Sequence, residues 1–389
     1  MSLLMTEITV ETPLDPYEGY RQLRQKAPVS KMDDGVWQVA SHESVQAVLR
    51  DPRTFSSDVA LRPPEEKSTP SMLFSDAPLH NRLRKLVSHA FKPSHIESQR
   101  ELIAERCEEL MLKLKTYQQA DLVEAMAAPL PVTVIAHMLG VADGDIREFK
   151  SWSDAIFSNI ADILFGTASP EAVKAGEKMD AYFLAQIEQL RLASKSHLLG
   201  RLVETETEDG KLSDEELLSF CRLLLIAGNE TTTGLITGSV RILDEFPQTL
   251  QQLKSNPALI PTFVEEALRF YSPFSATARR TTCDTELGGV LIPAGDLVIP
   301  LMASANRDEK VFQNPDEFII DRNPNPHLAF GFGIHFCLGA HLARLEGEIF
   351  LQSVIKHLET ISLVEKDHSQ MSDLGGPSKL MINLKALKE

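Results

Sequence analysis

Cysteine is scarce in this chain. Only four cysteines occur in 389 residues, and no two of them form a CxxC pair. Scattered cysteines argue against a disulfide framework and against a zinc finger, and they suit a reducing compartment. We therefore expect a cytoplasmic protein. The four are Cys107, Cys221, Cys283 and Cys337.

Long apolar runs are also missing. The longest, LLSFCRLLLIAG at residues 217–228, is interrupted by Arg222 and is shorter than the roughly 20 residues that a membrane span needs. The N-terminal stretch has neither a basic start nor a long apolar core, so we expect no signal peptide. The chain is therefore predicted to have no membrane partner.

Positive charge is in deficit, with 39 Lys and Arg against 55 Asp and Glu and a net charge of −16. Such an excess of negative charge opposes bulk binding to nucleic acid or to an anionic membrane. Internal repeats and low-complexity linkers are absent too. Because 43% of the residues are hydrophobic, the chain can bury a large core. We expect a single domain over residues 1–389 that acts as a monomer.

Helical periodicity dominates what is present. A helix that starts in the acidic stretch 212–216 can run unbroken to Phe246, just before Pro247, and a helix of that length spans a whole domain. Residues 56–78 are rich in Pro and Ser and predict a long loop. The fold class is therefore mainly α with a minor β component. Further helices are expected at 15–27, 41–50, 144–158, 170–193 and 261–273, and strands at 35–40 and 285–300.

The stretch FGFGIHFCLG, residues 330–339, gathers three glycines, His335 and Cys337 in ten residues. A buried structural cysteine is the plainest interpretation, because free thiols usually serve that role. A phosphate-binding GxGxxG loop is set aside, since Phe336 occupies its sixth position. A zinc or copper site could use His335, Cys337 and His341, but no fourth ligand is evident nearby.

A haem thiolate ligand is the remaining interpretation of Cys337. Cysteine thiolate donates electron density to haem iron and favours O–O cleavage. Gly331 and Gly333 would let backbone pass close beneath a flat macrocycle, and Gly339 would let the following helix approach. At a helix N-terminus the thiolate is stabilised. His335 could donate a hydrogen bond to a haem carboxylate.

These residues resemble the cysteine-ligand loop of the cytochrome P-450 superfamily, FxxGxxxCxG. The match falls on Phe330, Gly333, Cys337 and Gly339. Other signatures of the superfamily occur in the right order over nearly the whole chain. The resemblance implies one large haem-thiolate domain with the long helix over haem b, and Cys337 as the ligand of its iron.

The EEALRF stretch matches the ExxR motif of that superfamily at Glu266 and Arg269. An i,i+3 ion pair is usually a solvated surface pair of little energetic value. The resemblance instead implies a buried network, joined here by Arg322, that supports the cysteine loop.

The AGNETT stretch, residues 227–232, resembles the oxygen-binding part of the long helix. Two threonines tolerated in a helix would be the plainest interpretation. The resemblance implies that Ala227 and Gly228 leave room over the haem. Glu230 and Thr231 would then be an acid–alcohol pair that relays protons to dioxygen.

Two further matches concern the haem carboxylates. His80 and Arg84 are four residues apart on a predicted helix, so both can face one carboxylate. The resemblance adds an arginine before the ELGG strand, which counting from Leu287 assigns to Arg279, with Arg280 as the neighbouring alternative.

The resemblance implies a monooxygenase that hydroxylates or otherwise oxidises an apolar small molecule, such as a fatty acid, terpenoid or steroid. Electrons would come from a ferredoxin or flavodoxin and its reductase. A docking surface on the cysteine side would include Arg100, Arg344 and nearby lysines. The alternatives are a peroxide-using hydroxylase, which would replace the acid–alcohol pair, and a non-catalytic haem sensor. Substrate contacts are expected from residues 56–76, 159–168, 224–231, 275–277 and 374–377.

Overall fold

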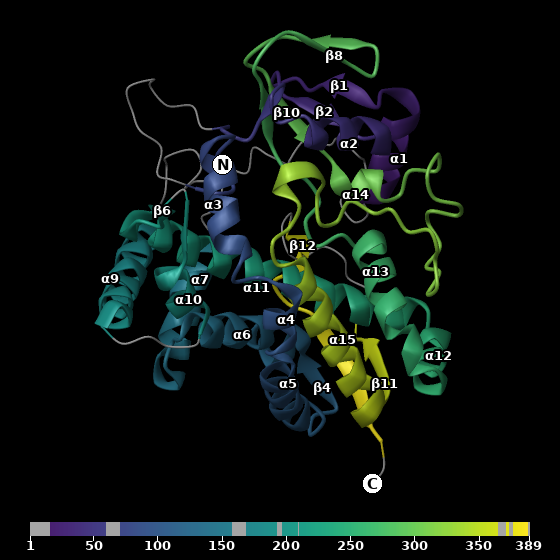
Figure 1. Cartoon of the computed structure of the whole chain (residues 1–389). Coiled ribbons are helices and arrows are strands. Elements are labelled where there is room, and N and C mark those ends of the chain that lie inside the picture. Colours follow the sequence, from purple (N-terminus) through teal and green to yellow (C-terminus); the bar gives the residue numbers. More distant parts are fainter. Residues whose placement is uncertain are drawn as a thin grey trace. The chain divides into compact units, whose positions relative to one another are not determined.

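Figure 1 shows the computed structural model of the chain as a ribbon. The described residues form two compact units, and each is described by itself. The helical unit comprises Ser57–Ser98 and Val132–Asn229, and the sheet unit comprises Met5–Ser56, Gln99–Pro131 and Glu230–Glu389. The expectation of one domain over residues 1–389 stays a prediction. The structure describes residues 16–59, 71–157, 169–192, 197–208, 210–364, 371–372 and 376–387.

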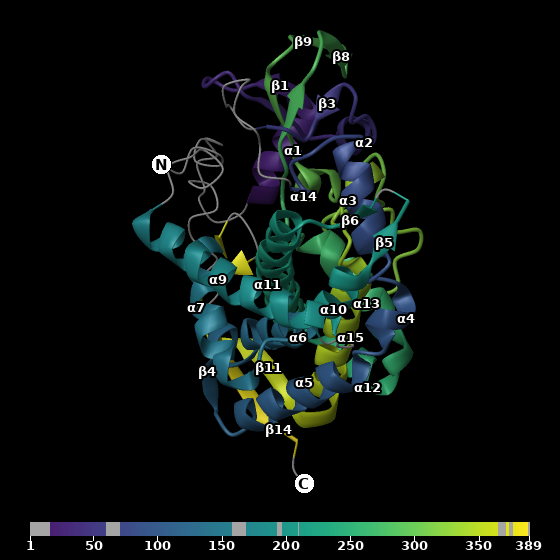
Figure 2. The ribbon, with the colours of Figure 1, turned by 60° about the vertical axis from the view of Figure 1, so that its left-hand side comes forward.

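The helical unit is built from antiparallel and crossing helices with one small hairpin. Helices α7, α9 and α10 lie next to one another in Figure 2, and the rings of Phe149 and Phe183 meet edge to face at 6.0 Å between α7 and α9. Aromatic pairs of this geometry anchor a helix–helix core. Its elements are α3 (Leu79–Ser88), α4 (Pro93–Glu97), most of α6 (Pro129–Leu139), a 3-10 turn (Asp143–Asp145), α7 (Ile146–Phe157), α9 (Pro170–Leu192), α10 (Leu198–Glu204), β5 (Glu206–Thr207) and β6 (Gly210–Lys211).

The long helix predicted over residues 212–246 is confirmed as α11 (Asp214–Glu245). Three acidic residues occupy its first turn, where their charge stabilises the positive end of the helix dipole. The helix ends just before Pro247, which cannot continue the hydrogen-bond ladder. The first part of α11 belongs to the helical unit and the part from Glu230 onward to the sheet unit.

The sheet unit contains a five-stranded sheet in the order β1-β2-β10-β7-β3. Strands β2 and β10 pair in parallel, with Val298 opposite Trp37, 261 positions away in the sequence, and the other neighbours are antiparallel. Valines and a tryptophan on these strands are buried in a core with helix α2 (His42–Arg50). The strands are β1 (Val29–Lys31), β2 (Trp37–Val39), β3 (Phe55–Ser56), β7 (Arg279–Thr281) and β10 (Leu297–Pro300).

Smaller sheets complete the β component. Strands β8 (Thr285–Leu287) and β9 (Val290–Ile292) form a hairpin. Its two-residue turn is Gly288–Gly289, both at positive φ, which two-residue hairpins require. Strand β14 (Met381–Ala386) pairs with β11 (Leu358–Leu363) and β4 (Gln119–Asp121), and β12 (Met371–Ser372) pairs with β13 (Gly376–Pro377).

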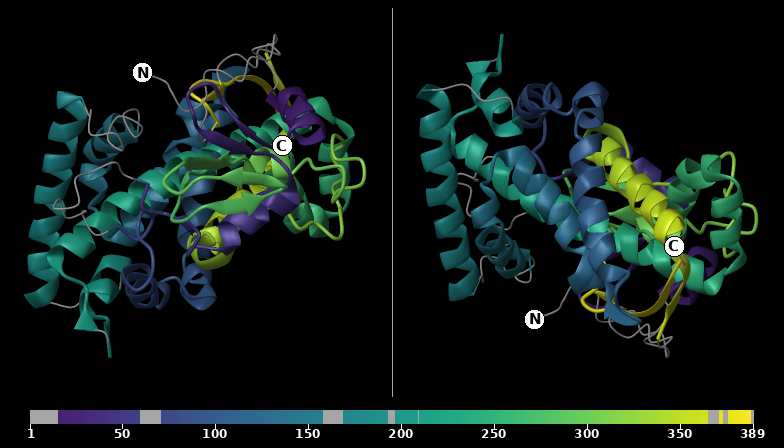
Figure 3. Two further views of the ribbon diagram at one scale, coloured as in Figure 1. Left: turned by 90° about the horizontal axis from the view of Figure 1, so that it is seen from above. Right: turned by 90° about the horizontal axis from the view of Figure 1, so that it is seen from below.

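The helices of the sheet unit flank these strands. Helices α5 and α15 lie side by side, as the right-hand view of Figure 3 shows. Ser41 caps α2 by accepting a hydrogen bond from the Ser44 N–H. The helices are α1 (Pro16–Lys26), α2 (His42–Arg50), α5 (Arg100–Leu114), a π-helix (Val123–Ala127), α12 (Gln248–Ser255), two 3-10 turns (Pro257–Leu259 and Gly333–His335), α13 (Ile260–Phe270), α14 (Met302–Ala305) and α15 (Ala340–His357).

The predicted fold class is confirmed, because helices dominate and the strands are short, with two to six residues each. The helices expected at 15–27, 41–50, 144–158, 170–193 and 261–273 are α1, α2, α7, α9 and α13, each within a few residues. Within the described residues, no helix has the length and apolar character to cross a membrane.

Candidate active site

The cysteine loop, residues 330–339, follows the glycines that the sequence singled out. Gly331 and Gly333 have φ of +71° and +74°, a conformation that other residues adopt only with strain. A Cβ added at Gly333 would lie 2.6 Å from the Leu49 carbonyl oxygen, so backbone of α2 packs directly on the loop. The N–H of Cys337 donates to the Phe330 carbonyl at 2.9 Å and closes the loop.

Cys337 differs from the other cysteines in its surroundings. Cys107 and Cys221 are fully buried, and burial raises the pKa of the Cys107 thiol to about 12 and that of Cys221 even further. Both thiols therefore stay protonated. Cys337 is half-buried and lies just before α15, whose N-cap is Gly339. A thiol beside the free N–H groups of a helix start is suited to ionise.

The space beside the Cys337 thiol does not require glycine at position 339. A Cβ added there would lie 4.0 Å from Sγ of Cys337, an ordinary van der Waals contact. His335 is half-buried in the 3-10 turn of the loop, and Phe330 is buried.

Glu266 and Arg269 form the buried network that the sequence predicted. Both side chains are 0% exposed, and the guanidinium donates to the carboxylate at 2.8 and 2.7 Å. Arg322 donates from Nε to both oxygens of Glu266 at 3.0 Å. Arg269 also donates to the carbonyls of Asn306, Pro315 and Glu317. The network therefore fixes the segment that leads into the cysteine loop.

Three consecutive threonines of α11 have different surroundings in the sheet unit. Thr232 and Thr233 are buried; Thr232 Oγ1 lies 3.4 Å from Oε2 of Glu346, and Thr233 donates to the Ala127 carbonyl. Thr231 and the adjacent Glu230 are half-buried. The predicted acid–alcohol pair thus occupies the more open face of a helix segment that is otherwise buried.

The two small residues of AGNETT lie in the helical unit. Ala227 is exposed, as a residue facing open space would be. Gly228 differs from the expectation: a Cβ there would lie 2.9 Å from Cδ1 of Ile135 in α6. The missing side chain at Gly228 therefore makes room for α6.

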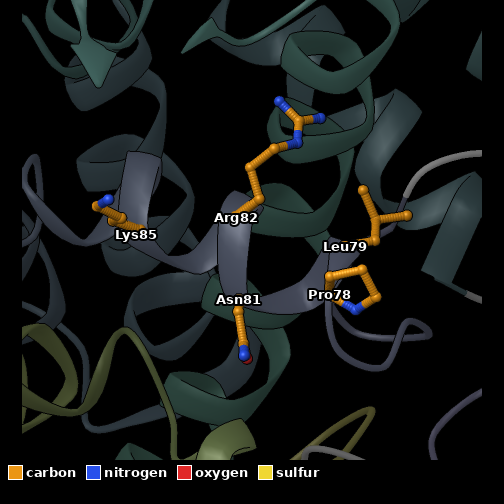
Figure 4. Close-up of a pocket in the computed structure, with 5 residues that line it drawn as sticks. All are labelled: Pro78, Leu79, Asn81, Arg82 and Lys85. Carbon is orange, nitrogen blue, oxygen red and sulfur yellow. The ribbon is translucent and has the colours of Figure 1, made fainter. Parts of the chain in front are cut away.

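His80 and Arg84 lie one turn apart on α3 of the helical unit. His80 is 1% exposed and Arg84 is half-buried, so the face they share is turned inward. Between them in sequence, Asn81 and Arg82 belong to other faces of the helix (Figure 4).

A hollow of about 500 Å³ lies along those other faces of α3 (Figure 4). Its two cations have acidic partners, because Arg82 pairs with Glu216 and Lys85 pairs with Glu208 at 2.6 Å. With its charges matched in this way, the hollow has no evident role in the chemistry. Its lining is Pro78, Leu79, Asn81, Arg82 and Lys85.

Strand β7 separates the two arginines that the sequence could not distinguish. Arg279 is 7% exposed and donates to the Ala278 carbonyl at 2.7 Å. Arg280 alternates to the opposite face and donates to the exposed Gly295 carbonyl at 2.6 Å. Arg279 is therefore the inward-facing member of the pair.

Among the described residues, no three His, Cys, Asp or Glu side chains are grouped so that they could hold a metal ion. The zinc or copper site considered from the sequence therefore has no support there.

Sequence reasoning missed two buried or half-buried groups, Glu346 and the Glu265–Arg344 pair. Their partners are far away in sequence, and no local motif marks them. Of the expected substrate contacts, residues 60–70, 159–168 and 374–375 lie outside the described residues.

Comparisons with known proteins agree with one another. A family model described as Cytochrome P450 matches residues 29–384. The cytochrome P450 monooxygenase PikC of Streptomyces venezuelae is 37% identical over 386 residues, covering 96% of this chain and 90% of PikC. The erythromycin C-12 hydroxylase of Saccharopolyspora erythraea is 38% identical over 353 residues, covering 90% and 88%. The crystal structure of CYP109E1 from Bacillus megaterium with testosterone has a TM-score of 0.86 at 36% identity, covering 95% and 99%.

Proposed function

Because the chain belongs to the cytochrome P450 family, we propose that it inserts one atom of dioxygen into an apolar small molecule, using electrons from a separate protein. Family membership confirms the fold class, the monooxygenase class and the haem cofactor with a cysteine thiolate ligand that the sequence predicted. The observation that carries the proposal is the half-buried pair Glu230 and Thr231 in the middle of α11.

Cys337 is the proposed ligand of the haem iron. Its surroundings fit: a Cβ added at Gly331 would meet only the His335 carbonyl oxygen, at 3.9 Å, among the described residues, and the thiol lies before the N-terminus of α15. The missing side chain at Gly333 instead makes room for α2. The buried thiols of Cys107 and Cys221 do not fit, because burial raises their pKa. When bound, haem supplies the iron at which dioxygen is reduced and cleaved, and a thiolate ligand favours that cleavage.

The other cofactor contacts are proposed residue by residue. His80 and Arg84 from α3, together with Arg279 and His335, would hold the haem carboxylates, since charge-assisted hydrogen bonds to a carboxylate are strong. The inward orientation of Arg279 supports it over Arg280.

Three residues would contact the macrocycle without ionic bonds. Ala227 offers an exposed, small side chain on α11. Phe330 places a buried ring beside the cysteine loop, and Gly339 begins α15 next to the thiol. Small and flat groups at these places would let haem lie close to the backbone.

Glu230 and Thr231 would be the catalytic residues. The Thr231 hydroxyl would hold the water that donates a proton at the reaction site, and the Glu230 carboxyl would resupply that proton from solvent. The pair supports the use of dioxygen over the use of peroxide, since a peroxide supplies its own protons. It also argues against a haem sensor, which needs no proton relay.

The relatives indicate the size of the substrate. One relative is named for the C-12 hydroxylation of erythromycin, and a neighbouring structure contains testosterone. We propose an apolar substrate in this range, a macrolide, steroid, terpenoid or fatty acid. The electron donor would be a ferredoxin or flavodoxin with its reductase, and the enzyme would act as a monomer in the cytoplasm.

Two measurements test this function. The haem-loaded protein is first screened with members of these four compound classes for a spin-state shift in its absorption spectrum. Compounds that shift it are then incubated either with a ferredoxin, its reductase, NADPH and oxygen, or with hydrogen peroxide alone. Product from the first mixture and little from the second is expected. Product only with peroxide would support the peroxide-using hydroxylase, and no product from any binder would support a sensor.

A further inference from the structure

A second ion pair, one residue from the buried network, lies behind the cysteine loop. Glu265 of α13 accepts two hydrogen bonds from Arg344 of α15, at 2.6 Å from Nε and 2.9 Å from Nη2. A fork of this kind fixes the planes of both groups. The side chains are 32% and 29% exposed, so neither is an ordinary surface charge.

His327 completes the arrangement from the segment before the loop. Its Nδ1 accepts a hydrogen bond from the Ala329 N–H at 3.3 Å, so the ring proton belongs on Nε2. Nε2 lies 3.2 Å from Oε2 of Glu265 and donates to it. The His327 side chain is 4% exposed. Glu265 therefore receives donors from two different elements.

The ion pair reaches the cysteine through Phe330. The guanidinium carbon of Arg344 lies 4.5 Å from the centre of the Phe330 ring, a cation–π contact, and the His327 ring lies 6.0 Å from the same ring. The carbonyl of Phe330 in turn accepts the Cys337 N–H at 2.9 Å. One residue thus connects the brace, defined as Glu265, Arg344 and His327, with the backbone of the thiol.

The charge of Arg344 is already matched inside the protein. Burial alone would raise the pKa of Glu265, but the hydrogen bonds from His327 and Arg344, and the charge of Arg344, lower it to about 2. Glu265 is therefore ionised at neutral pH. Because the Arg344 guanidinium already binds the Glu265 carboxylate and the Phe330 ring, we expect it to contribute little to the binding of an electron donor. This differs from the docking role that the sequence suggested.

We propose that Glu265, Arg344 and His327 position Phe330 and the Cys337 backbone, and thereby tune the thiolate and the reduction potential of the haem. Arg344 is then a positioning residue for the electron-transfer step and not a contact for the electron donor. The inference rests on the proposed assignment of Cys337 as the ligand.

The key variant is Arg344→Lys, which keeps the positive charge but removes the fork and the flat group over Phe330. The midpoint potential of the haem-loaded protein is measured by dithionite titration with mediator dyes, and the Soret band of the reduced carbon monoxide complex is recorded. No protein donor is present in either measurement. The matched control is Lys356→Met, which removes a cation from the last turn of the same helix, where Lys356 pairs with Glu108.

If the three residues act as a brace, Arg344→Lys should shift the midpoint potential and broaden or split the Soret band, while Lys356→Met should match the parent. Glu265→Gln, which keeps the size of the acceptor, should shift the potential in the same direction. The double variant should shift it by less than the sum of the two single variants, because both act through one unit.

Two results would overturn the brace. One is an unchanged potential and Soret band in both Arg344→Lys and Glu265→Gln. The other is shifts that add in the double variant. Failure of the proposed function is separate: it would show as a parent protein that lacks the red-shifted Soret band of a thiolate complex. If the parent shows that band while Arg344→Lys and Glu265→Gln keep the parent's midpoint potential and Soret band, the brace is rejected and the proposed function is not.

Discussion

The Thr232 hydroxyl oxygen on α11 lies 3.4 Å from Oε2 of Glu346 on α15, and both residues are buried. Among the described residues, Oε1 of Glu346 has no hydrogen-bond partner. Burial raises the pKa of this carboxyl to about 8, although the hydrogen bond from Thr232 acts in the opposite direction. Glu346 is therefore largely protonated in the folded protein at neutral pH.

This carboxyl should make stability depend on pH. An unfolded Glu loses its proton near pH ~4.3, whereas folded Glu346 keeps it up to about pH 8. Between these values the folded state binds the extra proton, so the contribution of Glu346 to stability is lost as pH rises. The neighbouring Cys107 thiol, with a pKa of about 12, does not titrate in that window.

We expect Glu346→Gln to gain stability relative to the parent as pH rises through this window, and to show no such trend below it. Denaturant unfolding at a series of pH values measures the difference. Glu101→Gln, an exposed change on α5, is the control and should follow the parent. Parallel curves for Glu346→Gln and the parent would contradict the raised pKa.

Arg269→Ala should destabilise the protein strongly. The change leaves Arg322 as the cation beside the buried Glu266 carboxylate and removes a donor from the carbonyls of Asn306 and Pro315. The Glu317 carbonyl keeps a hydrogen bond from Arg322. Breaking a buried pair costs about 3–5 kcal/mol. Arg21→Ala removes an exposed pair of the same i,i+3 spacing, with Glu18, and should cost about 1 kcal/mol or less. Equal losses in the two variants, measured by denaturant unfolding, would show that the network is no stronger than a surface pair.

Gly333→Ala should disturb the cysteine loop in two ways. A side chain at φ +74° costs about 1–2 kcal/mol, and the new Cβ would also lie 2.6 Å from the Leu49 carbonyl oxygen. Gly289→Ala has a similar φ of +79° with nothing within 4 Å, so it measures the strain without the clash. We expect the Gly333 variant to lose more stability and to retain less haem after purification. A Gly333 variant as stable as the Gly289 variant would mean that α2 moves aside readily.

Cys337→Ser should abolish the red-shifted Soret band of the reduced carbon monoxide complex, because an alcohol does not replace a thiolate donor. Cys283→Ser changes an exposed cysteine and should leave the band in place. Absorption spectra of both proteins after haem loading decide the matter. Persistence of the band without Cys337 would assign the ligand to another cysteine.

Thr231→Ala should separate electron use from product formation. The variant keeps the thiol and nearly the same volume, so substrate binding and electron uptake should continue. Without the hydroxyl that holds the proton-donating water, product per NADPH should fall and hydrogen peroxide should rise. Ser239→Ala on the same helix removes a hydroxyl that bonds only the Leu235 carbonyl at 2.7 Å among the partners described, and should keep the parent's coupling.

Glu230→Gln is expected to slow NADPH consumption as a whole, because the resupply of protons is lost. NADPH, product and peroxide are measured in parallel for all three variants. If Thr231→Ala forms as much product per NADPH as the parent does, the AGNETT stretch is not a proton relay.

Much of the fold and part of the site could be read from local sequence. The helix Asp214–Glu245 follows from an acidic start, a long stretch without proline and an end just before Pro247. Glycine at positions 331 and 333 permits the positive φ that both residues adopt, so the sequence allowed a tight loop there. The spacing of Glu266 and Arg269 places them on one helix face, and the network joined by Arg322 is confirmed.

Other features depended on partners that the sequence does not bring together. Gly228 faces Ile135 of α6, where local reasoning placed open space, because only helix packing decides which side of α11 is covered. Arg279 and Arg280 are chemically alike, and the pleat of β7 alone turns one inward.

Glu265 and Glu266 show the division most clearly. The sequence determined that two adjacent carboxylates occupy α13, and a helix turns adjacent side chains about 100° apart. Tertiary structure decided that Glu266 meets Arg269 and Arg322 while Glu265 meets Arg344, 79 positions away. The physical reason is that an ion pair forms only where folding brings both charges within hydrogen-bond distance and removes water around them. Residue types and local spacing are written in the sequence, but that distance and that burial exist only in the folded chain.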